Sequence, residues 1–288
     1  MESFKIKISP EADGMRMSEY LKRILGFSST LITKVKYGGV ILNESTVTMR
    51  ATVKAGDELQ IIFPSEESEN VLPIPTPLDI LYEDEYLIAV NKPKNMPVHP
   101  SRGNHLVTLA NAIAAYLDKP FVFRAVNRLD RDTCGIVIIA KDQYCAARLS
   151  ASMKSGNFEK YYTALLSSVP KEKSGIINAP IEREEEGSIK RIVRDDGKEA
   201  LTEYKVTKIF DDGRALCEIR LHTGRTHQIR VHFAHIGSPL YNDFLYGTIV
   251  DPNATYSLCC SKIVFPHPIT AKRMTVALSE NLEELLLR

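Results

Sequence analysis

The sequence predicts an α+β protein with a mixed, largely antiparallel central sheet, flanking helices and a small αα-β unit at its N-terminus. Short strand patterns separated by acidic turns ending in glycine follow one another between residues 176 and 221. Elsewhere helical and strand patterns alternate without βαβ regularity and without an internal repeat. A proline-rich stretch at 64–77 separates the first 63 residues from the rest. Irregular, strand-rich alternation of this kind is typical of α+β folds.

The composition is that of an ordinary globular protein. With 288 residues, of which 44% are hydrophobic and 25% charged, the chain can form one large and one small domain. No signal-peptide pattern and no apolar run of about 18 residues occurs, so we expect no membrane partner. Five cysteines without a CxxC pair predict reduced thiols in a cytoplasmic protein, which we expect to be a monomer. The net charge of +1 does not indicate nucleic-acid binding, although basic residues gather between 124 and 160.

The first 63 residues combine two helices with a short β unit. Serine pairs with glycine stops mark the helices, and alternating apolar residues mark the strands. Lys34 and Lys36 lie outside the apolar stripe of the second helix and should therefore be exposed. The predicted elements are a strand over 1–9, a helix over 17–25, a helix opening at Ser28 or Ser29 and ending at Gly38, and strands over 40–43 and 58–63.

This N-terminal unit resembles the S-four-like RNA-binding domain. The resemblance rests on the serine start of the second helix, on Gly-Val-x-x-Asn at 39–43 and on Val-x-x-Gly-Asp at 53–57. It implies that the unit binds RNA and that Lys34 and Lys36 contact it. The alternative is a small structural domain without RNA affinity.

A linker and a larger second domain follow. Residues 64–77 contain four prolines among polar and acidic residues, and proline favours a semi-extended chain. The predicted organisation is therefore a domain over 1–63, a linker over 64–77 and a second domain over 78–288. The second domain should contain two strands around an acidic turn at 78–93, a helix at 109–117 capped by Thr108, a buried strand at 136–140, a helix from Asp142 to Gly156, a strand at 159–166, short strands between 176 and 221, a helix opening at Thr226, and one or two strands ending near Val276.

A polar loop with an aspartate between arginines leads directly into the buried strand at 136–140. Asp130 lies between Arg128 and Arg131, and Gly135 ends the loop. A carboxylate held among cations next to a buried strand is a candidate catalytic group. A purely structural salt bridge explains these residues equally well.

A second cationic motif contains Arg225, Thr226, His227 and Arg230, at the predicted start of a helix. On a helix, His227 and Thr226 share a face with Arg230, so this end of the helix can bind a phosphate or a carboxylate. Asp130 is the candidate carboxylate. The histidine spacing does not match a helical zinc site, so no metal is expected.

Other catalytic motifs are absent from the sequence. It contains no GxGxxG, no GxxxxGK[ST] and no GxSxG pattern, so nucleotide-cofactor and serine-hydrolase chemistry is not indicated. Cys134 lies at the entry of a strand without an assigned base, which favours a packing role over nucleophilic catalysis.

Four motifs together resemble the RluA-type pseudouridine synthases. They are Asn-Arg-Leu-Asp-x-x-Thr-Cys-Gly at 127–135, Lys-x-Tyr-x-Ala at 160–164, Gly-Arg-Thr-His-Gln-Ile-Arg-Val-His at 224–232, and the Asn-Lys-Pro and Val-His-Pro pair between 91 and 100. The family usually has histidine at the position of Asn127, serine at that of Cys134 and histidine at that of Ser238. The resemblance covers essentially the whole chain.

The resemblance implies isomerisation of uridine in RNA to pseudouridine without a cofactor or metal. Asp130 would act at ribose C1′, covalently or by elimination, with Arg230 keeping it ionised and oriented. Tyr162 would pack under the base or remove the proton at C5, and Arg128 would fill the space of the extruded base. The remaining substrate-binding candidates are Arg131, Arg225, His227, Lys34 and Lys36.

Ribosomal RNA is the favoured partner, because the S-four-like unit indicates it, and transfer RNA remains open. Two other functions compete with this one. A non-catalytic, ribosome-associated RNA-binding protein would keep the fold but not depend on Asp130. A hydrolase would act on free nucleosides instead of structured RNA.

Overall fold

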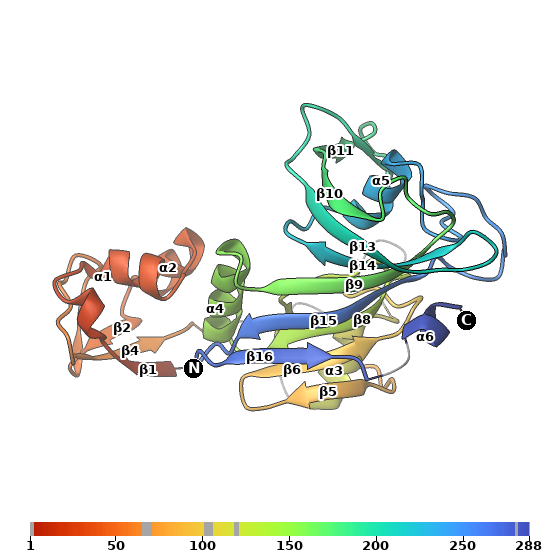
Figure 1. The fold of residues 1–288 in the computed structure, drawn as a ribbon. Coiled ribbons are helices and arrows are strands. Elements are labelled where there is room, and N and C mark those ends of the chain that lie inside the picture. Colours follow the sequence, from red (N-terminus) through yellow and green to blue (C-terminus); the bar gives the residue numbers. More distant parts are fainter. Residues whose placement is uncertain (1–2, 65–70, 101–105, 118–120, 280–281, 288) are drawn as a thin grey trace.

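The computed structural model describes residues 3–64, 71–100, 106–117, 121–279 and 282–287. These residues form an N-terminal unit with its own sheet and a larger unit built on a mixed sheet (Figure 1). Residues 65–70 of the predicted linker lie outside the described residues. The end of the linker packs on the larger unit, because Asn111 Nδ2 donates a hydrogen bond of 2.8 Å to the Leu72 carbonyl.

Four strands and short helical segments build the N-terminal unit. Ser28 caps the second helix, as its hydroxyl accepts a hydrogen bond from the Leu31 amide. Lys34 and Lys36 are exposed, as predicted. The helix predicted over 17–25 is an α-helical turn continued by a π-helix. In spatial order the strands are β1 (Ser3–Lys7), β4 (Glu58–Ile62), β2 (Val40–Leu42) and β3 (Ser45–Thr46), and the helical segments are η1 (Pro10–Ala12), α1 (Met17–Glu19), η2 (Tyr20–Ile24) and α2 (Ser29–Val35).

The larger unit contains a ten-stranded sheet, of which eight strands form a continuous path. Their neighbours pair antiparallel except β8 and β15, which run parallel with Cys134 opposite Cys259. This is the mixed, largely antiparallel sheet that the sequence predicts. In spatial order the path is β10 (Ser174–Asn178), β13 (Leu201–Ile209), β14 (Ala215–Leu221), β9 (Glu159–Leu166), β15 (Leu258–Pro266), β8 (Cys134–Ala140), β6 (Leu87–Lys92) and β5 (Asp79–Glu83); β16 (Arg273–Ala277) pairs with β15, β7 (Arg124–Ala125) with β8, and β11 (Ile181–Arg183) with β12 (Arg191–Val193).

Four helices accompany the larger sheet. The predicted caps are present: Thr108 Oγ1 accepts from the Asn111 amide, and Asp142 accepts from the Cys145 amide. No described helix is long and apolar enough to cross a membrane. The last short helix was not predicted from the sequence. The helices are α3 (Leu109–Leu117), α4 (Gln143–Lys154), α5 (Gln228–His235) and α6 (Leu282–Leu287).

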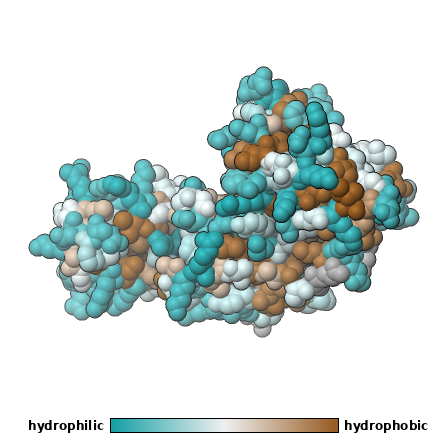
Figure 2. Space-filling view, viewed as in Figure 1, coloured by the Kyte–Doolittle hydropathy of each residue, from teal (hydrophilic) through white to brown (hydrophobic). Residues whose placement is uncertain are grey.

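The N-terminal unit packs against α4. The rings of Phe4 and Tyr144 stack with their centroids 3.7 Å apart, and Arg148 Nη1 donates a hydrogen bond of 2.6 Å to the Ile24 carbonyl. The surface of the N-terminal unit is largely hydrophilic in Figure 2, whereas apolar residues gather on the lobe that carries β10 and α5. Helix α4 therefore connects the N-terminal unit to the core of the large sheet.

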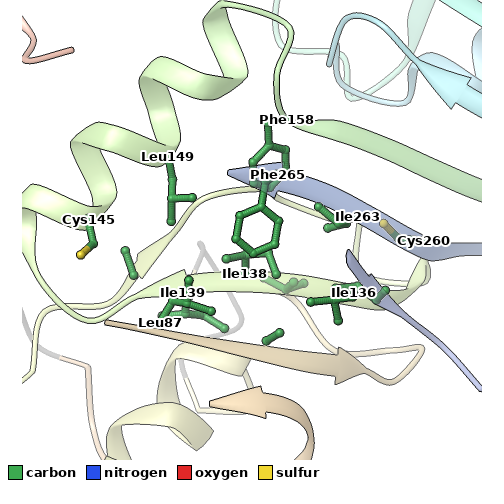
Figure 3. Packing of buried hydrophobic residues seen from close by; sticks show 14 of the residues in the cluster. Leu87, Ile136, Ile138, Ile139, Cys145, Leu149, Phe158, Cys260, Ile263 and Phe265 are labelled. Atoms are coloured by element: carbon green, nitrogen blue, oxygen red, sulfur yellow. The ribbon is translucent and has the colours of Figure 1, made fainter. Parts of the chain in front are cut away.

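Strand β8 forms the centre of the hydrophobic core. All seven of its residues are buried. Ile136, Ile138 and Ile139 pack with Leu149 of α4 and Phe265 of β15 (Figure 3). Each such side chain contributes about 1.5–3 kcal/mol on burial. The strand is therefore a rigid support for the loop that precedes it.

Gly135 allows β15 to approach β8 closely. Its φ is +106°, and a Cβ there would lie 2.3 Å from the carbonyl oxygen of Cys260. We expect Gly135→Ala to lower the free energy of unfolding by at least about 2–3 kcal/mol, because backbone strain and a backbone clash add. Urea unfolding measures this loss. Gly156→Ala is the matched control, since its φ is +77° but nothing lies within 4 Å of the added carbon. Equal losses in the two variants would contradict the clash.

Candidate active site

A cavity of about 570 Å³ opens where segments distant in the sequence meet. The loop before β8 contributes residues 125–131, β9 contributes Lys160 and Tyr162, and the segment entering α5 contributes residues 224–230. Pro97–His99 also line it, together with Thr133, Met153, Leu221 and Leu258. The four motifs that carry the family resemblance therefore line one cavity.

Asp130 projects into this cavity from the loop before β8. Its side chain is about one-third exposed, at 32%. Oδ2 lies 3.9 Å from Arg230 Nη1 and 4.0 Å from His227 Nε2, so it faces a guanidinium and an imidazole nitrogen without a direct hydrogen bond to either. The carboxylate is thus held near a cation but left available for a substrate.

Arg230 has a different principal partner from the one that the sequence predicted. Its guanidinium is buried and donates two hydrogen bonds of 2.7 Å to Asp243, whose side chain is fully buried. Asp243 Oδ1 also accepts from the Leu245 and Tyr246 amides. The prediction paired Arg230 with Asp130 alone, and no sequence signal had marked Asp243. Asp243 is therefore the direct hydrogen-bond partner of Arg230, and Asp130 is a second carboxylate at a longer distance.

Three aromatic rings surround the Arg230 guanidinium. Its Cζ lies 4.1 Å from the ring centroid of Tyr256, 5.0 Å from that of Tyr246 and 5.2 Å from that of Phe244. Rings at these distances attract a cation and restrict its movement. Tyr256 also forms a hydrogen bond of 3.1 Å with Thr133, in the Asp130 loop. The rings therefore fix the cation relative to the carboxylate.

The segment entering α5 differs from the predicted helix start. The helix begins at Gln228, and His227 precedes it with a left-handed φ of +58°, so Thr226 is not the cap. Gln228 Oε1 accepts from the Arg225 amide and from Thr223 Oγ1. The sequence predicted a regular helix over 226–230, because a left-handed residue before a helix does not alter the spacing of its apolar residues. The left-handed turn directs His227 towards Asp130.

Two buried groups on β9 form part of the cavity wall. Tyr162 is almost fully buried, and burial raises the pKa of its phenol well above the usual value. The hydroxyl is therefore protonated at neutral pH in the free protein, which favours packing under a base over proton removal. Burial lowers the pKa of Lys160, which lines the same wall and was not singled out from the sequence.

The predicted cationic residues fall into two groups. Arg128 is exposed and lines the cavity, as do Arg131 and Arg225. Arg131, however, makes two hydrogen bonds of 2.9 Å to Asp132, which is buried. Lys34 and Lys36 lie on α2, outside this cavity. The structure thus brings every predicted site residue together except these two lysines.

Asn127 and Lys92 hold the Asp130 loop in place through hydrogen bonds to backbone groups. Asn127 is buried, donates to the Ile136 carbonyl and accepts from the Ile138 amide. Lys92 is fully buried, and its ammonium donates to the carbonyls of Pro93, Met96 and Arg131. The loop is therefore anchored at both ends. Within the described residues no group of three or more His, Cys, Asp or Glu side chains is placed to hold a metal ion.

Lys92 should make stability depend on alkaline pH. Burial lowers its pKa to about 8, from 10.5 ordinarily, so between these values the unfolded chain binds more protons than the folded chain. The free energy of unfolding should therefore rise with pH, by about 2 kcal/mol between pH 7.5 and 9.5 from this group alone. Urea unfolding of the natural protein and of Lys92→Met at both pH values isolates the effect. A difference between the two proteins that stays flat or falls would contradict it.

The fold is similar to that of two solved human structures. It aligns with a human structure described as RNA Pseudouridylate Synthase Domain Containing 1, with a TM-score of 0.61 and 24% identity over 71% of this chain and 84% of that one. A second human structure, described as RNA Pseudouridylate Synthase Domain Containing 4, aligns with a TM-score of 0.57 and 20% identity over 70% and 88% of the two chains. These two likenesses establish the fold.

The family follows from sequence. A family model described as RNA pseudouridylate synthase matches residues 86–235, and the chain belongs to this family. It is 38% identical to YjbO of Bacillus subtilis, described as an uncharacterized RNA pseudouridine synthase, over 90% of this chain and 93% of the relative. It is 35% identical to ribosomal large subunit pseudouridine synthase D of Xanthomonas campestris, over 83% and 73%. The protein is thus an RNA pseudouridine synthase, an isomerase.

Proposed function

We propose that the protein converts a specific uridine in structured ribosomal RNA to pseudouridine, with Asp130 acting at ribose C1′. One observation carries this proposal: Asp130 Oδ2 lies 3.9 Å from Arg230 in the cavity, while Asp243 holds that arginine. The carboxylate therefore lies beside a fixed cation without being engaged in a direct hydrogen bond to it. An ionised, accessible carboxylate is what attack at C1′ requires.

The proposed reaction involves only the uridine and Asp130, and needs no oxidant, reductant or further reactant. The carboxylate bonds to C1′ as the bond from C1′ to N1 breaks, and the electron pair leaves with the uracil anion. The base then turns so that C5 bonds to C1′ and displaces Asp130. Finally C5 loses its proton and N1 gains one, which gives an isomer of the starting nucleotide. An elimination at the ribose, with Asp130 as the base, leads to the same product and differs in its intermediate.

The cavity walls suit a base removed from its stack. Extruding a base costs a few kcal/mol, which contacts with the protein must offset. Arg128, exposed at the cavity rim, fills the space left in the RNA, and Tyr162 packs against the extruded base. Arg225 and Arg131 contact flanking phosphates; Arg131 is the weaker contact because Asp132 shares its charge.

The N-terminal unit provides a further RNA contact in this proposal. Residues 1–63 form an S-four-like domain, 64–77 a linker and 78–288 the catalytic domain. Lys34 and Lys36 are exposed on α2, so they are accessible to RNA that extends beyond the catalytic cavity. The names of the ribosomal relatives favour ribosomal RNA over transfer RNA, and the cytoplasm is the expected compartment.

Release of tritium from uridine labelled at C5 tests the proposed reaction, because the step that forms pseudouridine expels that atom. The purified protein is incubated with labelled ribosomal RNA, with transfer RNA and with free uridine. Release from ribosomal RNA alone is the expected result. Release only from transfer RNA would make transfer RNA the substrate. Release from free uridine would show that the protein acts on the free nucleoside and does not require structured RNA. Mapping pseudouridines in RNA from cells lacking the protein identifies the position.

A further inference from the structure

A hydroxyl group lies behind His227, on the side of the ring that faces away from Asp130. Tyr246 Oη lies 2.8 Å from His227 Nδ1, while His227 Nε2 is the nitrogen that faces the Asp130 carboxylate, at 4.0 Å. The rings of His227 and Tyr246 meet edge to face, with centroids 5.7 Å apart. The imidazole therefore lies between a phenol and the proposed nucleophile.

A second hydrogen bond to Tyr246 Oη bears on the direction of its hydrogen bond with His227. The backbone amide of Arg191, on β12, donates a hydrogen bond of 2.9 Å to this oxygen, and an amide N–H can only donate. Within the described residues, Nδ1 is the acceptor that remains for the Tyr246 proton. A phenol that donates to Nδ1 leaves a neutral His227 with its own proton on Nε2.

Two further features support a neutral imidazole in a fixed orientation. Burial lowers the pKa of His227, so it is uncharged at neutral pH. Its left-handed backbone, with φ at +58°, costs of order 1 kcal/mol for a residue other than glycine. Such a conformation persists when surrounding contacts impose it, and the Tyr246 hydrogen bond is one of these contacts.

We propose that Tyr246 is a positioning residue: it fixes the tautomer of His227 so that Nε2–H and the Arg230 guanidinium both face Oδ2 of Asp130. Both approaches, of 4.0 and 3.9 Å, are to this one oxygen. Oδ1 is then the oxygen that bonds to C1′. This inference rests on the proposed reaction for the role of Asp130, but the tautomer itself does not.

Nitrogen NMR of protein labelled in its histidine rings tests the tautomer without any substrate. His227→Leu identifies the His227 signals among those of the seven histidines. We expect a protonated Nε2 and an accepting Nδ1 at neutral pH, and a mixture of tautomers in Tyr246→Phe. A proton on Nδ1 in the natural protein, or an unchanged tautomer in Tyr246→Phe, would overturn the proposal.

Kinetics test the consequence for catalysis. Tyr246→Phe should lower kcat about 10- to 100-fold, as loss of an orienting partner does elsewhere, and should leave KM for RNA nearly unchanged. In the His227→Leu background the same change should have no further effect. An equal loss in both backgrounds would mean that Tyr246 acts through its ring contact with Arg230. Tyr116→Phe, which removes a phenol hydrogen bond to Glu83 far from the cavity, is the control.

The two experiments also separate this inference from the proposed function. If the natural protein isomerises no uridine in any RNA, the proposed function fails while the NMR result still decides the tautomer. If isomerisation occurs but Tyr246→Phe retains the full kcat, the positioning role of Tyr246 fails alone. Urea unfolding of Tyr246→Phe confirms that the variant is folded in either case.

Discussion

Asp130→Asn is expected to abolish uridine isomerisation, lowering kcat by at least about 10³-fold, as loss of a nucleophile does in other enzymes. The asparagine amide is too weak a nucleophile to attack C1′. It also cannot leave C1′ as a carboxylate anion when C5 bonds there. RNA affinity should change by no more than about twofold, because phosphate contacts provide most of it. Tritium release from C5 measures the first quantity and filter binding the second.

The structure also predicts that Asp130→Asn leaves the fold intact. Arg230 keeps its two hydrogen bonds to Asp243, and the Asp130 side chain is partly exposed, so the free energy of unfolding should change by less than about 0.5 kcal/mol. Asp195→Asn, an exposed turn position, controls for the loss of one acidic charge. Substantial isomerisation by Asp130→Asn would assign the attack at C1′ to another group.

Asp243→Asn is expected to damage both stability and catalysis. Breaking a buried ion pair by neutralising one partner costs about 3–5 kcal/mol, and the buried Arg230 would be left with Asp130, 3.9 Å away, as its nearest carboxylate. The arginine would then turn to Asp130 and close the gap of 3.9 Å, which engages the carboxylate that must attack. We expect an additional fall in kcat of about 10- to 100-fold. Urea unfolding and single-turnover kinetics measure the two effects.

Arg230→Ala should show a comparable loss of stability, since it leaves the buried Asp243 carboxylate unpaired. The double variant Arg230→Met with Asp243→Leu separates the roles: removing both charges should restore most of the stability, because a buried pair is often replaceable by apolar residues. Activity should stay absent in the double variant. Recovery of activity together with stability would show that Arg230 has only a structural role.

Local chemistry made much of the fold predictable. The caps at Ser28, Thr108 and Asp142 are formed by side chains within three residues of their targets, so the sequence contains both partners. Strand β9 matches the predicted range 159–166, because β-branched and aromatic residues favour a strand wherever it lies. The run 136–140 is uniformly apolar because its strand is buried on both faces.

Structural features that leave no local signal in the sequence were not predicted. Helix α6 is six residues long, too short for a periodic pattern, and the helix over 17–25 changes to a π-helix without a distinctive residue. The cap of α5 was placed one residue early, at Thr226, because His227 has a left-handed backbone that ordinary helix signals do not reveal. These errors concern one short element, one helix type and one element boundary.

The sequence by itself determined the enzyme family, the α+β architecture and several of the residues that line the cavity, because these depend on residue identity and on short-range periodicity. Only the tertiary structure decided which side chains meet there. Asp243 rather than Asp130 binds Arg230 directly, and rings from separate positions, Phe244, Tyr246 and Tyr256, surround it. Such meetings follow from the path of the chain between residues 230 and 256 and from core packing, and hydrogen-bond geometry over a few ångströms then selects among the possible partners.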